Sequence, residues 1–142
     1  MKHIHLIGIG GTGLSAIARL LLESGYTVSG SDMLASPQTQ NVREAGALVF
    51  IGHAAENIVG ADLVVRSSAI PDKNVEVQQA LRNRVPVLKR ADFLGQLMNG
   101  HQGIAVAGTH GKTSTTAMIA WMLSSLEQDP SFIVGGVIGN LG

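Results

Sequence analysis

The sequence contains no cysteine. Disulfide bonds, thiolate metal sites and cysteine nucleophiles are therefore excluded, which agrees with a cytoplasmic protein. The sequence also lacks an excess of charge of either sign, because Lys and Arg number 10 and Asp and Glu number 10. This balance supplies no basic surface for nucleic acid and no Lys/Arg cluster for a membrane surface. We therefore expect neither nucleic acid nor a membrane as a partner.

Long hydrophobic runs are absent as well. The longest apolar stretch, residues 14–22, contains Ser15 and Arg19 and is far too short to span a bilayer. A signal peptide is not expected, since the glycine-rich segment 8–13 would interrupt its apolar region. The expected location is the cytoplasm.

Short apolar runs typical of strands alternate along the chain with segments whose apolar residues recur at helical spacing. Many of the 18 glycines stand at the ends of these segments. The sequence predicts strands at residues 3–7, 26–31, 47–51, 62–67 and 85–88, with helices at 12–24, 36–45, 74–82 and 91–98. Alternation of this kind is typical of βαβ units with right-handed crossovers. The predicted fold class is α/β, with a Rossmann-like parallel sheet that carries helices on both faces.

A polar, glycine-rich segment at residues 99–103 predicts a linker, after which the pattern starts again. We expect a strand at 104–107, a phosphate loop, a helix at 113–124 and a strand at 132–134. Residues 1–98 would form the first domain, and residues 104–142 would be the truncated start of a second α/β domain. Met118, Trp121 and Met122 are expected to pack against the sheet of that second domain.

The first glycine loop, Gly-Ile-Gly-Gly-Thr-Gly at residues 8–13, fits G-x-G-x-x-G between a predicted strand and a predicted helix. Glycines allow a tight turn and a close approach of the backbone, and the N–H groups at a helix N-terminus attract an anion. The pattern therefore predicts a diphosphate site formed by Gly10, Gly11, Thr12 and Gly13.

Polar residues follow the next three predicted strands, where ligands of open α/β sheets bind. Asp32 ends the second strand, about twenty residues after the loop, where a carboxylate can bond a ribose hydroxyl. His53 follows the third strand and is either a ligand contact or a surface histidine. The fourth strand is followed by Ser67, Ser68, Ala69 and Ile70. These residues leave the ligand open between a dinucleotide such as NAD and a nucleotide diphosphate such as a UDP-sugar.

The second glycine loop is the more specific signal. The segment Gly108, Thr109, His110, Gly111, Lys112, Thr113 and Ser114 follows an apolar run and precedes a predicted helix. In a P-loop the backbone N–H groups cradle phosphates, the lysine reaches the β- and γ-phosphates, and the hydroxyl of the next residue binds Mg²⁺. The loop is a variant of G-x-x-x-x-G-K-[ST], because Val106 stands where the first glycine would fall.

The ordered set of motifs resembles the Mur ligases of bacterial cell-wall synthesis. The segments that carry the resemblance are GIGGTGLSAIA (8–18), VSGSD (28–32), GH (52–53), SSAI (67–70), GTHGKTSTT (108–116) and DPSFIVGG (129–136). They span nearly the whole chain. Two departures, Leu14 for a methionine and Ser114 for a threonine, are conservative.

The resemblance implies an ATP-dependent ligase that joins L-alanine to the lactyl carboxylate of UDP-N-acetylmuramate through an acyl phosphate. The first domain would bind the UDP-sugar, with the glycine loop at the diphosphate and Asp32, His53 and residues 67–70 around ribose and uracil. Residues 108–114 would bind ATP, with Lys112 as the catalytic charge-neutralising group and Thr113 as a Mg²⁺ ligand. The other Mg²⁺ ligands and the L-alanine site would lie beyond residue 142, so we expect these 142 residues alone not to ligate.

Two other readings remain open from the residues. An NAD(P)-binding domain of an oxidoreductase would explain the first loop and Asp32 but not the second loop. A non-catalytic UDP-sugar sensor would bind its ligand without turnover. Within the Mur family, a sister group that reattaches recycled murein peptide to the same UDP-sugar is the less favoured alternative, because its glycine loop differs.

Overall fold

The computed structural model describes residues 2–99 and 101–134. The chain divides into two compact units, Met1–Gly100 and His101–Gly142. This division falls inside the segment 99–103 that we expect to be a linker, and each unit is described separately below. In the described part of the chain, no helix is both long and apolar enough to cross a membrane.

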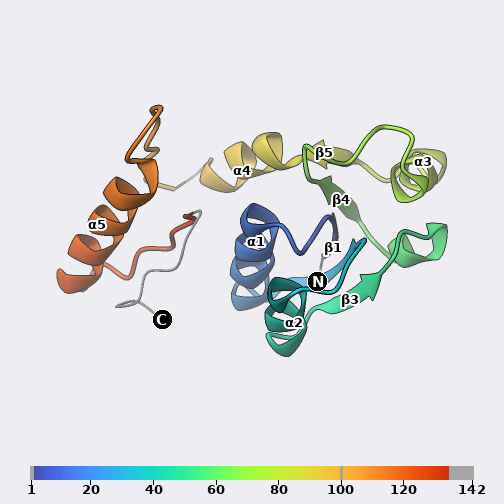
Figure 1. The fold of residues 1–142 in the computed structure, drawn as a ribbon, viewed down its shortest axis with the longest axis horizontal. Helices are drawn as coiled ribbons and strands as arrows, with labels where there is room; N and C mark the ends of the chain where they lie inside the picture. The colour runs from blue at the N-terminus through green and yellow to red at the C-terminus, as the bar shows by residue number, and fades with distance from the viewer. Residues whose placement is uncertain (1, 100, 135–142) are drawn as a thin grey trace. The chain divides into compact units, whose positions relative to one another are not determined.

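The first unit is built on one five-stranded sheet in the order β3-β2-β1-β4-β5, with every neighbouring pair parallel. Its strands are β1 (His3–Ile7), β2 (Thr27–Asp32), β3 (Leu48–Ile51), β4 (Leu63–Arg66) and β5 (Val87–Lys89). Its helices are α1 (Thr12–Glu23), α2 (Pro37–Glu44), the 3₁₀ turn η1 (Ala55–Ile58), α3 (Val75–Arg82) and α4 (Arg90–Met98). Figure 1 shows how strands and helices follow one another along the chain. The predicted Rossmann-like parallel sheet is confirmed.

Local sequence explains where the helices begin. Ser36 caps α2 by accepting a hydrogen bond from Thr39 N–H, and Thr39 Oγ1 accepts one from Ser36 N–H in return. Pro37 then occupies the first turn, where its missing N–H is not needed. Asn74 caps α3 by accepting from Glu76 N–H and Val77 N–H. The turn η1 was not predicted from the sequence.

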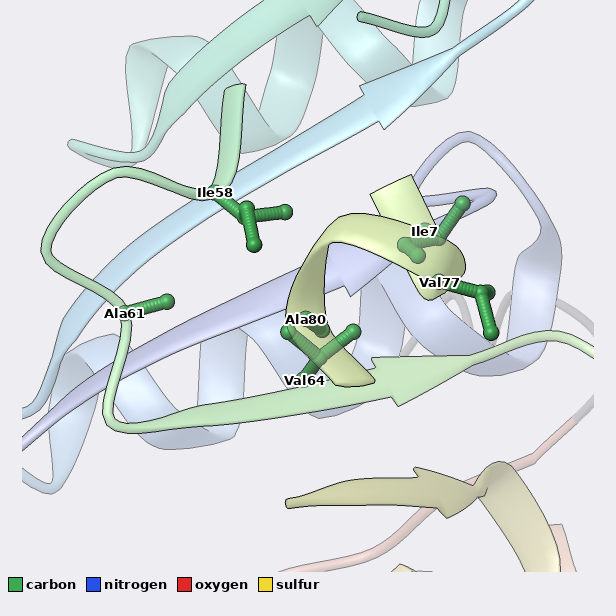
Figure 2. Packing of buried hydrophobic residues seen from close by; sticks show 6 residues of the cluster. All are labelled: Ile7, Ile58, Ala61, Val64, Val77 and Ala80. Atoms are coloured by element: carbon green, nitrogen blue, oxygen red, sulfur yellow. The ribbon is translucent and has the colours of Figure 1, made fainter. Parts of the chain in front are cut away.

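The sheet is covered on both faces, as neighbouring residues of β2 show. Ser31 points toward α3, where its hydroxyl contacts Glu76, whereas Gly30 faces Ile9 of the glycine loop that leads into α1. On the α3 side, a buried cluster joins the sheet to η1 and α3, and its members are Ile7, Ile58, Ala61, Val64, Val77 and Ala80. Figure 2 shows Val77 and Ala80 of α3 close to Ile7 of β1 and Val64 of β4. This packing holds the first turn of α3 over the sheet.

The second unit departs from the sequence prediction. Its one regular element among the described residues is α5 (Lys112–Ser125), which agrees with the helix predicted at 113–124. The strands predicted at 104–107 and 132–134 are wrong, because neither segment is a strand in the described residues. A strand requires a hydrogen-bonded neighbour, and the described part of this unit offers none. The final segment 135–142, with part of the DPSFIVGG motif, lies outside the described residues.

The apolar side chains of α5 are also placed differently from the prediction. Met118, Trp121 and Met122 are 65%, 50% and 54% exposed, rather than packed against a sheet. The reason is the same, since the described residues of this unit contain no sheet that could cover the helix.

Candidate functional site

The strand order places a cleft where Rossmann-type sheets bind their ligands. The order reverses at β1, which lies between β2 and β4, so the chain leaves β1 and β4 in opposite directions and opens a crevice at their carboxyl ends. A cleft of about 200 Å³ occupies this place. It is lined by Gly8, Gly11, Thr12, Gly13, Leu14, Ser67, Ser68 and Arg90. The structure thus brings the predicted glycine loop and two residues of the predicted 67–70 loop to one site.

The glycine loop is held against both neighbouring strands. The N–H groups of Gly8 and Ile9 donate to the carbonyl oxygen of Ser31 over 2.8 and 3.0 Å. Gly8 has φ +88°, and a Cβ there would lie 3.0 Å from Cβ of Ser67. Glycine at this position therefore allows the turn and also lets the loop after β4 approach.

The hydrogen bonds of the loop determine which of its N–H groups remain available for an anion. Asp32 Oδ2 accepts from Gly10 N–H over 2.9 Å, and Gly11 N–H donates to the carbonyl of Gly8 over 3.0 Å. These two N–H groups are therefore engaged within the protein rather than free for a diphosphate. In the described residues, the N–H groups of the first turn of α1, from Thr12 to Leu14, have no hydrogen-bond partner. They are the donors that this loop leaves available for an anion.

Asp32 thus has a structural contact that the sequence did not reveal. Its carboxylate fixes the glycine loop from the end of β2, close to Ser36 and Thr39 at the start of α2. Whether the same carboxylate also bonds a ribose hydroxyl stays a prediction.

Arg90 is a cleft residue that the sequence reasoning missed. It is the first residue of α4, directly after β5, and its guanidinium lies over Gly13 so closely that a Cβ at Gly13 would overlap Nη1. The cleft therefore has a permanent positive charge beside the open N–H groups of α1. The signal was present in the sequence, because Arg90 stands at the carboxyl end of the fifth strand, the edge at which ligands bind.

The loop after β4 is fixed by an arginine from the strand itself. Arg66 donates to the carbonyl of Ile70 over 2.7 Å and to Asp72 Oδ1 over 2.5 Å. Ser67 and Ser68 face the cleft with the glycine loop. Ile70 instead lines a neighbouring cleft of about 360 Å³, together with Arg66, Ser67, Ser68, Pro71, Asp72 and Lys89. Ala69 lines neither of these two clefts, so the structure separates the four predicted residues of this loop.

His53 lies on the α3 side of the sheet, next to β2, and does not line the cleft of the glycine loop. Its Nδ1 is 3.0 Å from Ser31 Oγ and 3.1 Å from Glu76 Oε2. Its side chain is 12% exposed, so the imidazole is held from within the protein and reaches the surface at one edge. Of the two alternatives that the sequence left open for His53, a ligand contact or a surface histidine, a freely exposed surface histidine does not agree with the structure.

Glu76 is a fully buried carboxylate at the centre of this group. Its Oε2 accepts from Ser31 Oγ over 2.6 Å, and its Oε1 accepts from Asn57 Nδ2 over 2.5 Å. A third donor, Ala54 N–H, reaches Oε1 over 3.4 Å. Nε2 of buried His5 lies 3.8 Å from Oε2, beyond hydrogen-bond distance. We call Glu76, Ser31, His53, Asn57 and His5 the Glu76 cluster.

The Glu76 cluster holds its carboxylate ionised. Burial by itself would raise the pKa of Glu76. The His5 imidazole and the donors Ser31 and Asn57 outweigh burial and lower that pKa from 4.5 to about 2. The sequence did not identify Glu76, because an acidic residue in the first turn of a helix is ordinarily a solvated partner of the helix dipole.

The second predicted loop begins α5 in the second unit. Gly111 caps the helix with φ 78°, and Gly108 has φ +151°, conformations that favour glycine. Lys112 Nζ donates to the carbonyl of Gly108 over 2.6 Å, so the lysine folds back over its own loop. Thr113 and Ser114 lie in the first turn of α5, and Thr109 and His110 lie between the two glycines.

The residues of this loop fit a nucleotide phosphate. They supply first-turn N–H groups and one ammonium, the donor set that a P-loop uses. Thr113 would supply one oxygen ligand to a magnesium ion. Across residues 2–99 and 101–134, no group of three or more His, Asp or Glu side chains is placed to hold a metal.

The fold is that of a Rossmann-type α/β module, followed by a glycine-rich loop of the P-loop kind. Residues 3–102 match the family model described as the Mur ligase family, catalytic domain. The chain belongs to the Mur ligase family.

Individual relatives agree with this assignment. The chain is 52% identical over all of its 142 residues to the UDP-N-acetylmuramate–L-alanine ligase of Dichelobacter nodosus. It superimposes with a TM-score of 0.92 on the UDP-N-acetylmuramate–alanine ligase of Thermotoga maritima, at 36% identity over 99% of this chain. For the UDP-N-acetylmuramate:L-alanyl-γ-D-glutamyl-meso-diaminopimelate ligase of Neisseria meningitides, the TM-score is 0.91 at 35% identity over 100% of this chain. The chain spans 30%, 33% and 45% of the lengths of these three proteins.

Proposed function

We propose that this chain is the UDP-sugar-binding domain and the start of the ATP-binding domain of a ligase that joins L-alanine to UDP-N-acetylmuramate. The observation that carries the proposal is the cleft at the switch point of the sheet. There the open N–H groups of Thr12–Leu14 and the guanidinium of Arg90 converge on the place where a diphosphate binds in this fold. The 52% identity to a relative of this activity favours L-alanine over a murein peptide as the second substrate.

In this proposal the residues of the first unit bind and orient the substrate. Thr12, Gly13 and Arg90 would hold the diphosphate, and Ser67 and Ser68 line the same cleft. Asp32 shapes the loop through Gly10 N–H and is available to a ribose hydroxyl. His53 and the 67–70 loop, with Ala69 and Ile70, would contact ribose and uracil beyond this cleft.

The second unit supplies the phosphate loop for ATP. Lys112 would leave the Gly108 carbonyl and neutralise charge on the transferred phosphoryl group. Thr113 would contribute a hydroxyl ligand to Mg²⁺. Bound Mg-ATP would supply the phosphoryl group that activates the lactyl carboxylate as an acyl phosphate. The amine of L-alanine would then attack the acyl carbon, form the amide and release phosphate.

A reciprocal pair of variants tests this assignment of ligands to units. Arg90→Gln removes the charge from the cleft of the first unit, and Lys112→Gln removes it from the loop of the second. We expect Arg90→Gln to weaken UDP-N-acetylmuramate binding about tenfold or more and to leave Mg-ATP binding unchanged, because a charged hydrogen bond contributes about 1.5–3 kcal/mol. Lys112→Gln should show the opposite pattern, as measured by calorimetric titration of each variant with each ligand.

Arg82→Gln is the matched control, since Arg82 is an exposed residue at the end of α3. It should bind both ligands as the unaltered chain does. Loss of UDP-N-acetylmuramate binding in Lys112→Gln, or its full retention in Arg90→Gln, contradicts the assignment.

A further inference from the structure

The Glu76 cluster lies between the sheet and α3. Its buried carboxylate has no role in the function proposed above. All the groups around Glu76 are donors or can donate: the Ser31 hydroxyl, the Asn57 amide and the Ala54 N–H. An ionised carboxylate accepts hydrogen bonds only. The remaining neighbour at hydrogen-bond distance is His53 Nδ1, at 3.1 Å from Oε2.

These contacts determine where the His53 ring carries its proton. The one proton of the Ser31 hydroxyl is donated to Glu76, so Ser31 Oγ can only accept from His53. Glu76 Oε2 can likewise only accept. A bare Nδ1 would place its lone pair against two other lone pairs at 3.0 and 3.1 Å, so Nδ1 must bear the hydrogen.

The other nitrogen of the ring is therefore the free one. In the described residues, Nε2 of His53 has no hydrogen-bond partner, and it is not among the buried polar atoms without a partner. Nε2 consequently reaches solvent at the exposed edge of the ring. In the neutral imidazole with hydrogen on Nδ1, Nε2 is an acceptor.

We propose that Glu76 is a positioning residue that holds His53 in the Nδ1–H form and so presents Nε2 as an acceptor to a hydrogen-bond donor of the nucleoside. The inference rests on the proposed function for the identity of the ligand, a UDP-sugar. Two groups of a uridine have the required chemistry, the ribose hydroxyls and the N3–H of uracil. A ligand carbonyl at the same place would meet a lone pair and would be disfavoured.

The first test is spectroscopic and does not depend on ligand. The chain is labelled with ¹⁵N-histidine, and His53→Asn identifies the His53 signals among those of the five histidines. At pH 8 we expect a protonated, pyrrole-type Nδ1 and an unprotonated, pyridine-type Nε2 at His53. Glu76→Gln should shift His53 toward the Nε2–H form, because an amide nitrogen then faces the ring. Hydrogen on Nε2 in the unaltered chain overturns the proposal even if Glu76→Gln does not fold.

The second test measures affinity for UDP-N-acetylmuramate. His53→Asn keeps an N–H near the position of Nδ1 but has no Nε2, so we expect about three- to tenfold weaker binding, the effect of one hydrogen bond. Glu76→Gln should weaken binding by a similar factor. The double variant should bind no more weakly than His53→Asn alone, since Glu76 acts through His53. Additive losses contradict the positioning role.

UDP analogues identify the donor on the ligand. If a ribose hydroxyl supplies it, 2′-deoxy-UDP or 3′-deoxy-UDP should bind equally to the unaltered chain and to His53→Asn. If uracil supplies it, N3-methyl-UDP should do so. An effect of His53→Asn that persists with all three analogues overturns the nucleoside contact. An Nδ1–H signal in a chain that binds no UDP-sugar would refute the proposed function while leaving the hydrogen-bonding role of Glu76 intact.

Discussion

Glu76→Ala is expected to lower the free energy of unfolding by about 4 kcal/mol, the largest loss of any single substitution considered for this chain. The substitution removes the acceptor shared by Ser31, Asn57 and Ala54 N–H. Of these donors, Asn57 keeps its second acceptor, the carbonyl of Gly52. It also removes the hydrogen bond from Ser31 of β2 to α3. Urea unfolding followed by circular dichroism measures the change.

Glu56→Ala is the matched control for Glu76→Ala. Glu56 is an exposed glutamate in η1, close to the same cluster, and its loss should change stability by less than about 0.5 kcal/mol. Equal effects of the two substitutions would show that the Glu76 cluster does not stabilise the fold.

The stability of Glu76→Gln relative to the unaltered chain is expected to depend on pH. The pKa of Glu76 is lower in the folded chain, about 2, than the ordinary 4.5. Its contribution to stability is therefore fully present above pH 4.5 and is lost as the pH falls toward 2. The stability difference between the unaltered chain and Glu76→Gln should shrink by about 3 kcal/mol across this window. A difference that stays constant would contradict the lowered pKa.

Gly30→Ala is the second substitution with a large expected effect, about 3 kcal/mol of destabilisation. A Cβ at Gly30 would lie 2.6 Å from the carbonyl oxygen of Leu6 and 2.6 Å from Cδ1 of Ile9. The Leu6 oxygen belongs to the neighbouring strand and cannot move aside without disturbing the sheet. Ile9 belongs to the glycine loop, so its displacement should also weaken UDP-N-acetylmuramate binding. Unfolding and titration of the same variant measure both effects.

Gly95→Ala serves as the control for Gly30→Ala. Gly95 lies inside α4, and a Cβ there has no neighbour within 4 Å. Alanine in a helix interior is more favourable than glycine by up to about 1 kcal/mol, so this variant should be as stable as the unaltered chain or slightly more stable. If Gly30→Ala is tolerated as well as Gly95→Ala, the close approach of the loop to β2 is not required.

The order of strands and helices in the first unit could be predicted because each element carries its own local signal. The Ser36-Pro37 pair marks the start of α2, and the glycine loop marks the turn from β1 into α1. The predictions of strands at 104–107 and 132–134 were wrong because they lacked a second kind of information. Apolar composition allows a strand, but pairing with a neighbour makes one, and that partner cannot be read from the segment itself.

The sequence could predict those residues of the candidate site that stand at the carboxyl end of a strand. That rule led to Asp32, His53 and Ser67, and the same rule would have led to Arg90 at the end of β5. The same rule could not predict the Glu76 cluster, because Glu76 lies on a helix and not at the end of a strand. Glu76 meets Ser31 across 45 positions of sequence, and only the packing of α3 on the sheet turns a residue of a helix N-terminus into a buried acceptor.

Calorimetric titration of the chain with UDP-N-acetylmuramate, with NADH in a parallel titration, tests the central claim most directly. The Mur ligase assignment and the cleft between the glycine loop, Ser67 and Arg90 predict that the UDP-sugar binds and that NADH does not. Binding of NADH without binding of UDP-N-acetylmuramate would contradict the account and would favour the dinucleotide-binding domain of an oxidoreductase.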